Sequence, residues 1–86
     1  MKLEDTVKMM LSDDEKEQLK AEYLQLVIRL RKLLDYWAKL DDRVTAEGGY
    51  ILSQITAMKD YQIALSKRLR LVGLMPSKLD NEIEEE

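Results

Sequence analysis

Hydrophobic residues recur at alternating steps of four and three in two long stretches that flank the pair Gly48-Gly49. The first stretch contains Leu19, Tyr23, Leu26, Leu30, Leu33, Trp37, Leu40 and Val44, and the second contains Ile51, Ile55, Met58, Gln62, Leu65, Leu69 and Val72. This alternation keeps one stripe of each helix facing a partner, which is typical of helices that pack along their length. A short loop between two such helices makes them antiparallel neighbours. We therefore predict an all-α fold built on a long, coiled-coil-like helical hairpin.

Local signals set the expected helix boundaries. We predict a single domain over residues 1–76, with helices at about 4–11, 12–46 and 50–72. The residues from Ser12 to Glu15 match a capping box at the start of the second helix. Gly48-Gly49 is expected to form the loop, Gly73 to follow the last helical residue of the third helix, and Pro76 to stop it.

Both long helices carry apolar residues outside the heptad stripe. These are Leu24, Val27, Ile28 and Leu34 in the first stretch, and Tyr50, Leu52, Ala57, Tyr61, Ile63, Ala64 and Leu71 in the second. An isolated hairpin buries one stripe of each helix, and a large apolar surface is unusual on a monomer. The pattern therefore predicts self-association into an oligomeric helical bundle.

The charges divide the chain into three parts, although the whole carries a net charge of −3. Residues 1–17 and 73–86 carry net charges of −3 and −4, and residues 18–72 carry +4. The acidic residues 77–86 are predicted to be a disordered tail because like charges repel and few apolar groups are available there. An electrostatic flap over the basic body is the alternative. A net charge of +4 is low for nucleic-acid binding, so nucleic acid is not an expected partner.

The composition excludes several kinds of chemistry. The chain has no cysteine and no histidine, so the usual thiolate and imidazole metal ligands are missing, and no histidine can activate a serine. We therefore expect neither an enzyme nor a resident metal or cofactor. Apolar runs never exceed three residues, which is too short to span a membrane. The start Met-Lys-Leu-Glu-Asp lacks a signal-peptide core, and we expect a cytoplasmic location.

Two basic clusters and one helical row provide candidate binding residues. Arg29 and Lys32 lie in the middle of the second predicted helix, and Arg68 lies near the end of the third, where an antiparallel hairpin brings it towards Arg29. Guanidinium groups bind phosphate oxygens in pairs. A solvated charged face is the alternative for both clusters.

The row consists of Gln54, Tyr61 and Arg68, which are spaced seven residues apart and share one helix face. It offers an amide, an aromatic ring and a guanidinium, which suit a nucleotide-like ligand. Other aromatic residues, such as Trp37 and Tyr23, fall on the heptad stripe and are expected to pack in the core. The predicted ligand-binding set is Arg29, Lys32, Gln54, Tyr61 and Arg68.

Two motifs resemble a group of small tailed-phage and prophage proteins that are described as related to a crAss-like phage protein. The first is Glu-Asp-Thr-Val-Lys-Met-Met-Leu-Ser-Asp-Asp at residues 4–14, followed by Lys-Ala-Glu-Tyr at 20–23 and Ile28-Arg29. The second is Gln54-x3-Met58-x2-Tyr61-x3-Leu65-x2-Arg68. In size and architecture the chain is also similar to the oligomeric sponges with which phages sequester cyclic-nucleotide or ADP-ribose signals.

The resemblance implies a phage anti-defence protein in the cytosol of the host bacterium. We expect a homo-oligomeric sponge that holds a phosphorylated nucleotide signal without catalysis. The alternative is a helical adaptor or inhibitor that binds a host defence protein through its exposed apolar stripe, and a structural phage component is a third possibility. A shared architecture does not decide among these functions.

Overall fold

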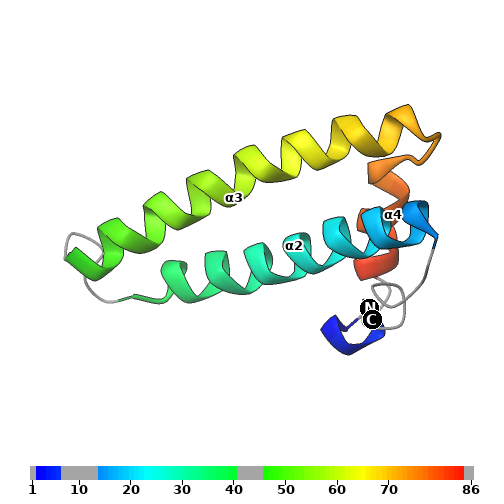
Figure 1. The fold of residues 1–86 in the computed structure, drawn as a ribbon. Helices are drawn as coiled ribbons and strands as arrows, with labels where there is room; N and C mark the ends of the chain where they lie inside the picture. Colours follow the sequence, from blue (N-terminus) through cyan, green and yellow to red (C-terminus); the bar gives the residue numbers. More distant parts are fainter. Residues whose placement is uncertain (1, 7–13, 41–45, 85–86) are drawn as a thin grey trace.

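The computed structural model describes residues 2–6, 14–40 and 46–84, and within these ranges every regular element is a helix. The elements are η1 (Leu3–Thr6), α2 (Glu15–Ala38), α3 (Ala46–Leu71) and α4 (Pro76–Glu84). The long helices α2 and α3 pack side by side as an antiparallel hairpin (Figure 1). The predicted all-α fold with two long packed helices is confirmed.

The start of α2 differs by a few residues from the predicted one. Asp14 is the N-cap, with extended backbone angles, and its Oδ1 accepts a hydrogen bond of 2.9 Å from the Lys16 amide. This bond satisfies one of the amides that lack a partner within the first turn. Ser12 lies outside the described residues. Glu15 and Glu17 place negative charge at the positive end of the helix dipole.

The loop of the hairpin does not lie at Gly48-Gly49. Helix α2 ends at Ala38, α3 already begins at Ala46, and both glycines are helical. A glycine costs about 1 kcal/mol relative to alanine inside a helix. The Tyr36 hydroxyl donates a hydrogen bond of 3.1 Å to Glu47 Oε1, which ties the first turn of α3 to the last turns of α2. Residues 41–45, which were predicted to belong to the second helix, lie outside the described residues.

The end of α3 has the predicted chemistry. Gly73 has a φ of 81°, its amide donates to the Arg70 carbonyl at 3.1 Å, and the Leu74 amide donates to the Leu69 carbonyl at 3.0 Å. These two bonds form a Schellman motif, which satisfies carbonyls at the helix end and favours glycine because of the positive φ.

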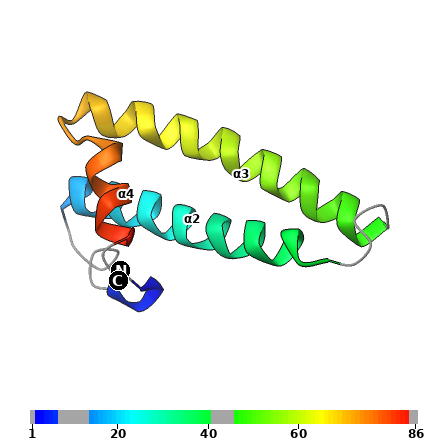
Figure 2. The ribbon, with the colours of Figure 1, turned by 180° about the vertical axis from the view of Figure 1, so that it is seen from behind.

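The acidic segment after Pro76 is a helix, so the prediction of a disordered tail over residues 77–86 is wrong for the described part. Pro76 opens α4, which crosses the end of the hairpin where α2 starts and α3 ends (Figure 2). Leu79 and Ile83 lie one turn apart on its inner face and are buried. Glu82 faces Lys20 of α2 at 3.8 Å, so part of the acidic charge is balanced by α2.

The core lies mostly at the end of the hairpin that α4 covers. The heptad stripe is buried there, as predicted, and Leu24, Val27 and Ile28 of α2 join the same cluster as Leu79 and Ile83 of α4. The chain itself therefore covers these three residues, which were predicted to require another copy. The large apolar residues of α3 that remain exposed are Tyr50, Leu52, Tyr61, Ile63 and Leu71.

A polar contact joins the three main helices inside this core. The Tyr23 hydroxyl donates a hydrogen bond of 2.8 Å to Asp80 Oδ1 of α4, and Gln62 Nε2 of α3 donates to the same hydroxyl at 3.4 Å. Burial raises the pKa of Tyr23 above its usual value of 10.0, and the Asp80 carboxylate raises it further. Gln62, the one polar residue of the heptad stripe of α3, thus pairs across the hairpin.

The 3-10 turn η1 packs against α2. Thr6 is fully buried, donates to the Leu3 carbonyl at 2.6 Å and accepts a hydrogen bond of 2.8 Å from Gln25 Nε2. The predicted helix at 4–11 is therefore a shorter 3-10 turn in its described part, and its remaining residues lie outside the described ranges. Neither η1 nor the three α-helices combine the length and apolarity that a membrane crossing requires.

Candidate functional site

A groove with a volume of about 680 Å³ runs between α2 and α3. Ligand pockets for small molecules commonly fall in this range of volume. The groove is lined by Glu22, Gln25, Leu26, Arg29, Lys32, Leu33 and Tyr36 of α2 and by Gln54, Met58 and Tyr61 of α3.

Helical periodicity explains which residues reach the groove. Glu22, Gln25, Arg29, Lys32 and Tyr36 follow one another at steps of three and four, so they share the face of α2 that adjoins the heptad stripe. The corresponding residues of α3 are also three and four positions apart. Leu26, Leu33 and Met58 belong to the heptad stripe itself. The groove therefore has an apolar floor and polar walls.

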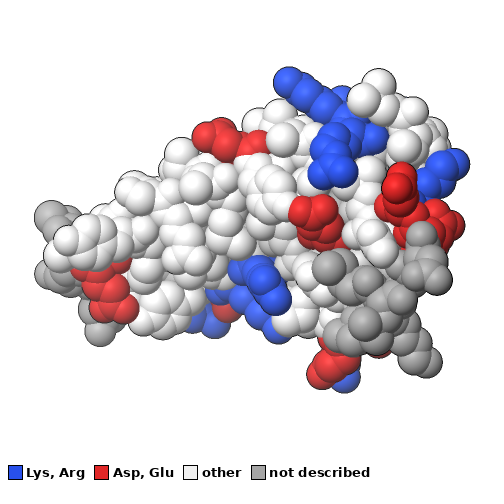
Figure 3. Space-filling view, in the orientation of Figure 1, with Lys and Arg blue, Asp and Glu red and all other residues white. Residues whose placement is uncertain are grey.

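Four of the five predicted site residues line this one groove, namely Arg29, Lys32, Gln54 and Tyr61. Arg29 and Lys32 are exposed, and among the described residues neither forms an ion pair. Their positive charges are thus available to an anion that enters the groove. Figure 3 shows basic groups beside the middle of α2 and over the end of α3, with acidic atoms between them.

The fifth predicted residue, Arg68, lies in a neighbouring hollow. That hollow is lined by Glu15, Gln18, Leu19, Glu22 and Arg68. The Arg68 guanidinium is 4.0 Å from Glu22 Oε2, and the Tyr61 hydroxyl donates a hydrogen bond to Glu22 Oε1. Glu22 thus separates Arg68 from the groove within one chain, and the predicted approach of Arg68 to Arg29 is interrupted by a carboxylate.

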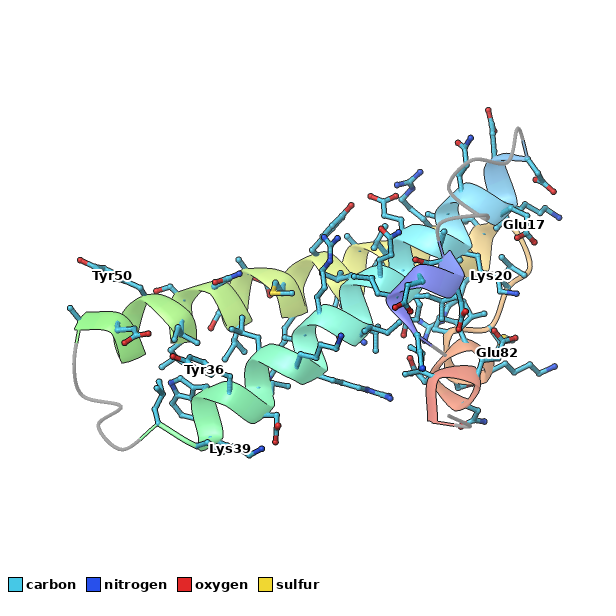
Figure 4. The ribbon with its side chains drawn as sticks, turned by 90° about the horizontal axis from the view of Figure 1, so that it is seen from below. Glu17, Lys20, Tyr36, Lys39, Tyr50 and Glu82 are labelled. Atoms are coloured by element: carbon cyan, nitrogen blue, oxygen red, sulfur yellow. The ribbon has the colours of Figure 1, made fainter. Side chains whose placement is uncertain are left out.

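Sequence reasoning missed Glu22 and Tyr36 as groove residues. Both lie seven positions from Arg29, on the same row of α2. The heptad spacing from Arg29 could therefore have identified both residues. Tyr36 lies between α2 and the start of α3, whereas Tyr50 points outwards from α3 (Figure 4). The hydrogen bond from Tyr36 to Glu47 raises the pKa of the Tyr36 hydroxyl.

The groove contains charged, amide and phenol groups that can bind a ligand. Two cations, one carboxylate, two amides and two tyrosines surround an apolar floor. The chain has no histidine or cysteine, and within the described residues no group of three histidine, cysteine or acidic side chains is placed to hold a metal ion. Such an arrangement suits a flat ligand that carries both an anionic group and hydrogen-bond donors.

The family model named Sequestin matches residues 13–71, which is more than two thirds of the chain, and the chain belongs to this family. The matched segment includes all of α2 and α3, and therefore every residue of the groove, whereas α4 lies outside it. Among curated proteins and solved structures, nothing matches the chain. The name of the family refers to sequestration.

Proposed function

We propose that this member of the Sequestin family is a phage anti-defence sponge, which assembles with copies of itself and holds a nucleotide-derived immune signal without transforming it. A signal of the cyclic-nucleotide or ADP-ribose type has the chemistry that fits the groove, and the host bacterial cytosol is where it would be met. The observation that carries the proposal is that Arg29, Lys32, Gln54 and Tyr61 meet in one groove over an apolar floor.

Each groove residue has a role that its chemistry suggests. Arg29 and Lys32 bind phosphate oxygens, since charge-assisted hydrogen bonds to phosphate are stronger than neutral ones. The Tyr61 ring stacks on a base, and the Gln54 amide bonds to the edge of that base. The Glu22 carboxylate accepts a hydrogen bond from a ribose hydroxyl. Leu26, Leu33 and Met58 exclude water from the lower face of the ligand.

Sequestration requires binding alone. A sponge lowers the free concentration of a signal when its Kd lies below the working concentration of that signal, and a Kd of about 1 μM corresponds to about −8 kcal/mol. The absence of histidine and cysteine from the chain fits a protein that returns its ligand unchanged.

Calorimetry against a panel of cyclic dinucleotides and cyclic ADP-ribose isomers tests the proposal. We expect the wild-type protein to bind at least one member of the panel, and Arg29→Glu to weaken this binding at least about tenfold because one charge-assisted contact is replaced by repulsion. Lys59→Glu is the matched control, because Lys59 is exposed and lines none of the described grooves. The bound ligand should be recovered intact after heat denaturation. Absence of heat with the whole panel, or conversion of the ligand, contradicts the proposal.

A second candidate is an adaptor or inhibitor that binds a host defence protein. Leu52 and Ile63 are 47% and 55% exposed on α3 and lie away from the groove. Exposed apolar side chains of this size are common at protein-protein interfaces. If the panel gives no heat and the wild type retains a host protein that Ile63→Glu releases, this second function replaces the first.

A further inference from the structure

Helix α3 carries a second unbroken heptad row on its exposed side. The row consists of Tyr50, Gln54, Ala57, Tyr61, Ala64, Arg68 and Leu71, which follow one another at alternating steps of four and three. Each member precedes by one position a member of the stripe that faces α2, so the second row is rotated by about 100° around the helix. All seven residues are exposed, Tyr50 by 75% and Leu71 by 87%. We call these seven residues the outer row.

Within the described ranges, the outer row remains exposed along its length, and α2 touches it through the contacts of Glu22 with Tyr61 and Arg68. Helix α4 and η1 pack against α2 and the core at the end of the hairpin, and both ribbon views show α3 as a free edge (Figures 1 and 2). An exact spacing of three and four over three heptads keeps a row in line with a second helix that lies alongside. Five of the seven members of the outer row, namely Tyr50, Ala57, Tyr61, Ala64 and Leu71, are apolar, more than a solvated face requires.

We infer that the outer row binds the outer row of a second copy of this chain, with the two α3 helices antiparallel. The inference rests on the self-association in the proposed function and names the surface that carries it. When the pair is centred on residue 59, nearly the whole of α3 overlaps its partner. Ala57 then faces the partner's Tyr61, Gln54 faces the partner's Ala64, and Tyr50 faces the partner's Arg68.

Complementarity of size and charge favours this arrangement. Each alanine meets a larger side chain, so the two rows interdigitate without voids, and Tyr50 offers an aromatic face to a guanidinium. A parallel pair in register instead places Arg68 against Arg68 and alanine against alanine, which combines repulsion with gaps. Antiparallel helices also oppose their dipoles. A two-fold axis makes every contact twice.

The pairing changes the groove. Gln54 and Tyr61 belong to both the outer row and the groove, so the partner helix forms a third wall beside them. The partner's Arg68 lies next to Tyr50, one turn from Gln54. Within one chain, Glu22 separates the Arg68 guanidinium from the groove. In the pair, the partner's Arg68 supplies a guanidinium near the end of the groove that Gln54 lines.

Adjacent substitutions on α3 test the surface. We expect the wild type to sediment as a dimer or a multiple of a dimer at about 50 μM. Ala64→Glu should raise the dissociation constant at least about a hundredfold, because it buries a carboxylate in place of a methyl group at two symmetric positions. Ile63→Glu lies about 100° away on the helix and should leave the assembly intact. Circular dichroism should show equal helix content for both variants.

Disulfide trapping tests the register, and the absence of cysteine from the chain gives a clean background. A mixture of Gln54→Cys and Ala64→Cys proteins should cross-link, since a disulfide requires Cα atoms within about 7 Å. Ala64→Cys alone should not, because its two copies are displaced by about 15 Å along the helices.

Three outcomes overturn the inference. They are a monomeric wild type, dissociation by Ile63→Glu with no effect of Ala64→Glu, and self-cross-linking of Ala64→Cys. Calorimetry separates this inference from the proposed function. An outer-row dimer that binds no nucleotide refutes the sponge and keeps the interface, whereas a monomer that binds nucleotide does the reverse.

Discussion

The two ends of the hairpin share one heptad pattern and differ in what covers it. At the proximal end, the first half of α2 is surrounded by α3, α4 and η1, and residues on several of its faces are buried. At the distal end, α3 is the one described element that lies beside α2 (Figure 1), and aromatic residues such as Tyr36 and Tyr50 are exposed. The heptad pattern therefore determines which face of α2 packs against α3. The number of additional elements around α2 determines how much of its surface is buried. Free energy of folding should be concentrated at the proximal end.

The groove crosses the border between these two regions. Glu22 and Gln25 stand on the proximal part of α2, whereas Tyr36 of α2 and Gln54 of α3 stand at the distal end. A ligand that contacts both regions would hold the distal end, which has fewer neighbouring elements, against the more fully packed proximal end.

Removal of α4 should have the largest effect on stability. Deleting residues 76–86 exposes the core that Leu79 and Ile83 cover, and each such side chain contributes about 1.5–3 kcal/mol when buried. We expect a loss of about 3–6 kcal/mol in the free energy of unfolding, measured by urea denaturation. The full-length double variant Leu79→Ala/Ile83→Ala should lose a similar amount of the free energy of unfolding. An unchanged unfolding curve for the deletion would contradict the assignment of α4 to the core.

The failure to predict α4 from sequence has a physical cause. A count of acidic residues does not show their position around a helix, and the spacing of four places Leu79 and Ile83 together on one buried face. The Asp80 carboxylate accepts from Tyr23, and Glu82 faces Lys20. These contacts join residues that are about 60 positions apart, and a local pattern contains no information about them.

Other features were local and therefore predictable. The heptad stripes determine which faces of α2 and α3 meet, and the Gly73 cap depends on a few consecutive residues. Four groove residues were found because rows on a helix follow from spacing alone. Arg68 was misplaced because spacing does not show that Glu22, on the other helix, lies between it and the groove. The helical state of Gly48 and Gly49 does not follow from local propensity, because a contact such as that of Tyr36 with Glu47 lies outside the local pattern.

A pair of leucine substitutions should sharpen the contrast between the two ends. Leu65 is fully buried at the proximal end, and Leu65→Ala should cost about 2–5 kcal/mol because it removes contacts and leaves a cavity. Leu52 is 47% exposed near the distal end, and Leu52→Ala should change the free energy of unfolding by less than about 0.5 kcal/mol. Both values come from urea denaturation at one protein concentration. Equal costs would show that burial is uniform along the hairpin.

The buried hydroxyl of Tyr23 should make a smaller contribution that depends on pH. Tyr23→Phe removes the hydrogen bond to Asp80 and should cost about 0.5–1.5 kcal/mol at pH 8. The pKa of Tyr23 is raised in the folded state, so its contribution is fully present below pH 10.0 and is lost as the pH rises through the raised value. The loss of stability on going from pH 9 to pH 11 should therefore be smaller in Tyr23→Phe than in the wild type.

An exposed tyrosine provides the control for this measurement. Tyr50→Phe, at the distal end, removes a hydroxyl from a side chain that is 75% exposed and should keep the free energy of unfolding of the wild type at pH 8. The Tyr36 hydroxyl, whose pKa is raised by its bond to Glu47, contributes in the same direction, so part of the alkaline loss remains in Tyr23→Phe. A pH profile that Tyr23→Phe leaves unchanged would show that the hydroxyl is hydrated.

The smallest effect on stability, and the most specific one on binding, is expected from Glu22→Gln at the border of the two regions. Glutamine still accepts the hydrogen bond from Tyr61 and loses a partly exposed ion pair with Arg68, so the free energy of unfolding should change by less than about 0.5 kcal/mol. Removing a negative charge from the groove should tighten binding of inorganic pyrophosphate about threefold, by an amount that shrinks as salt is added. Glu17→Gln removes the same charge outside the groove residues and should have no such effect. Equal shifts in the two variants would mean that pyrophosphate senses the net charge of the protein, and that Glu22 does not face the ligand.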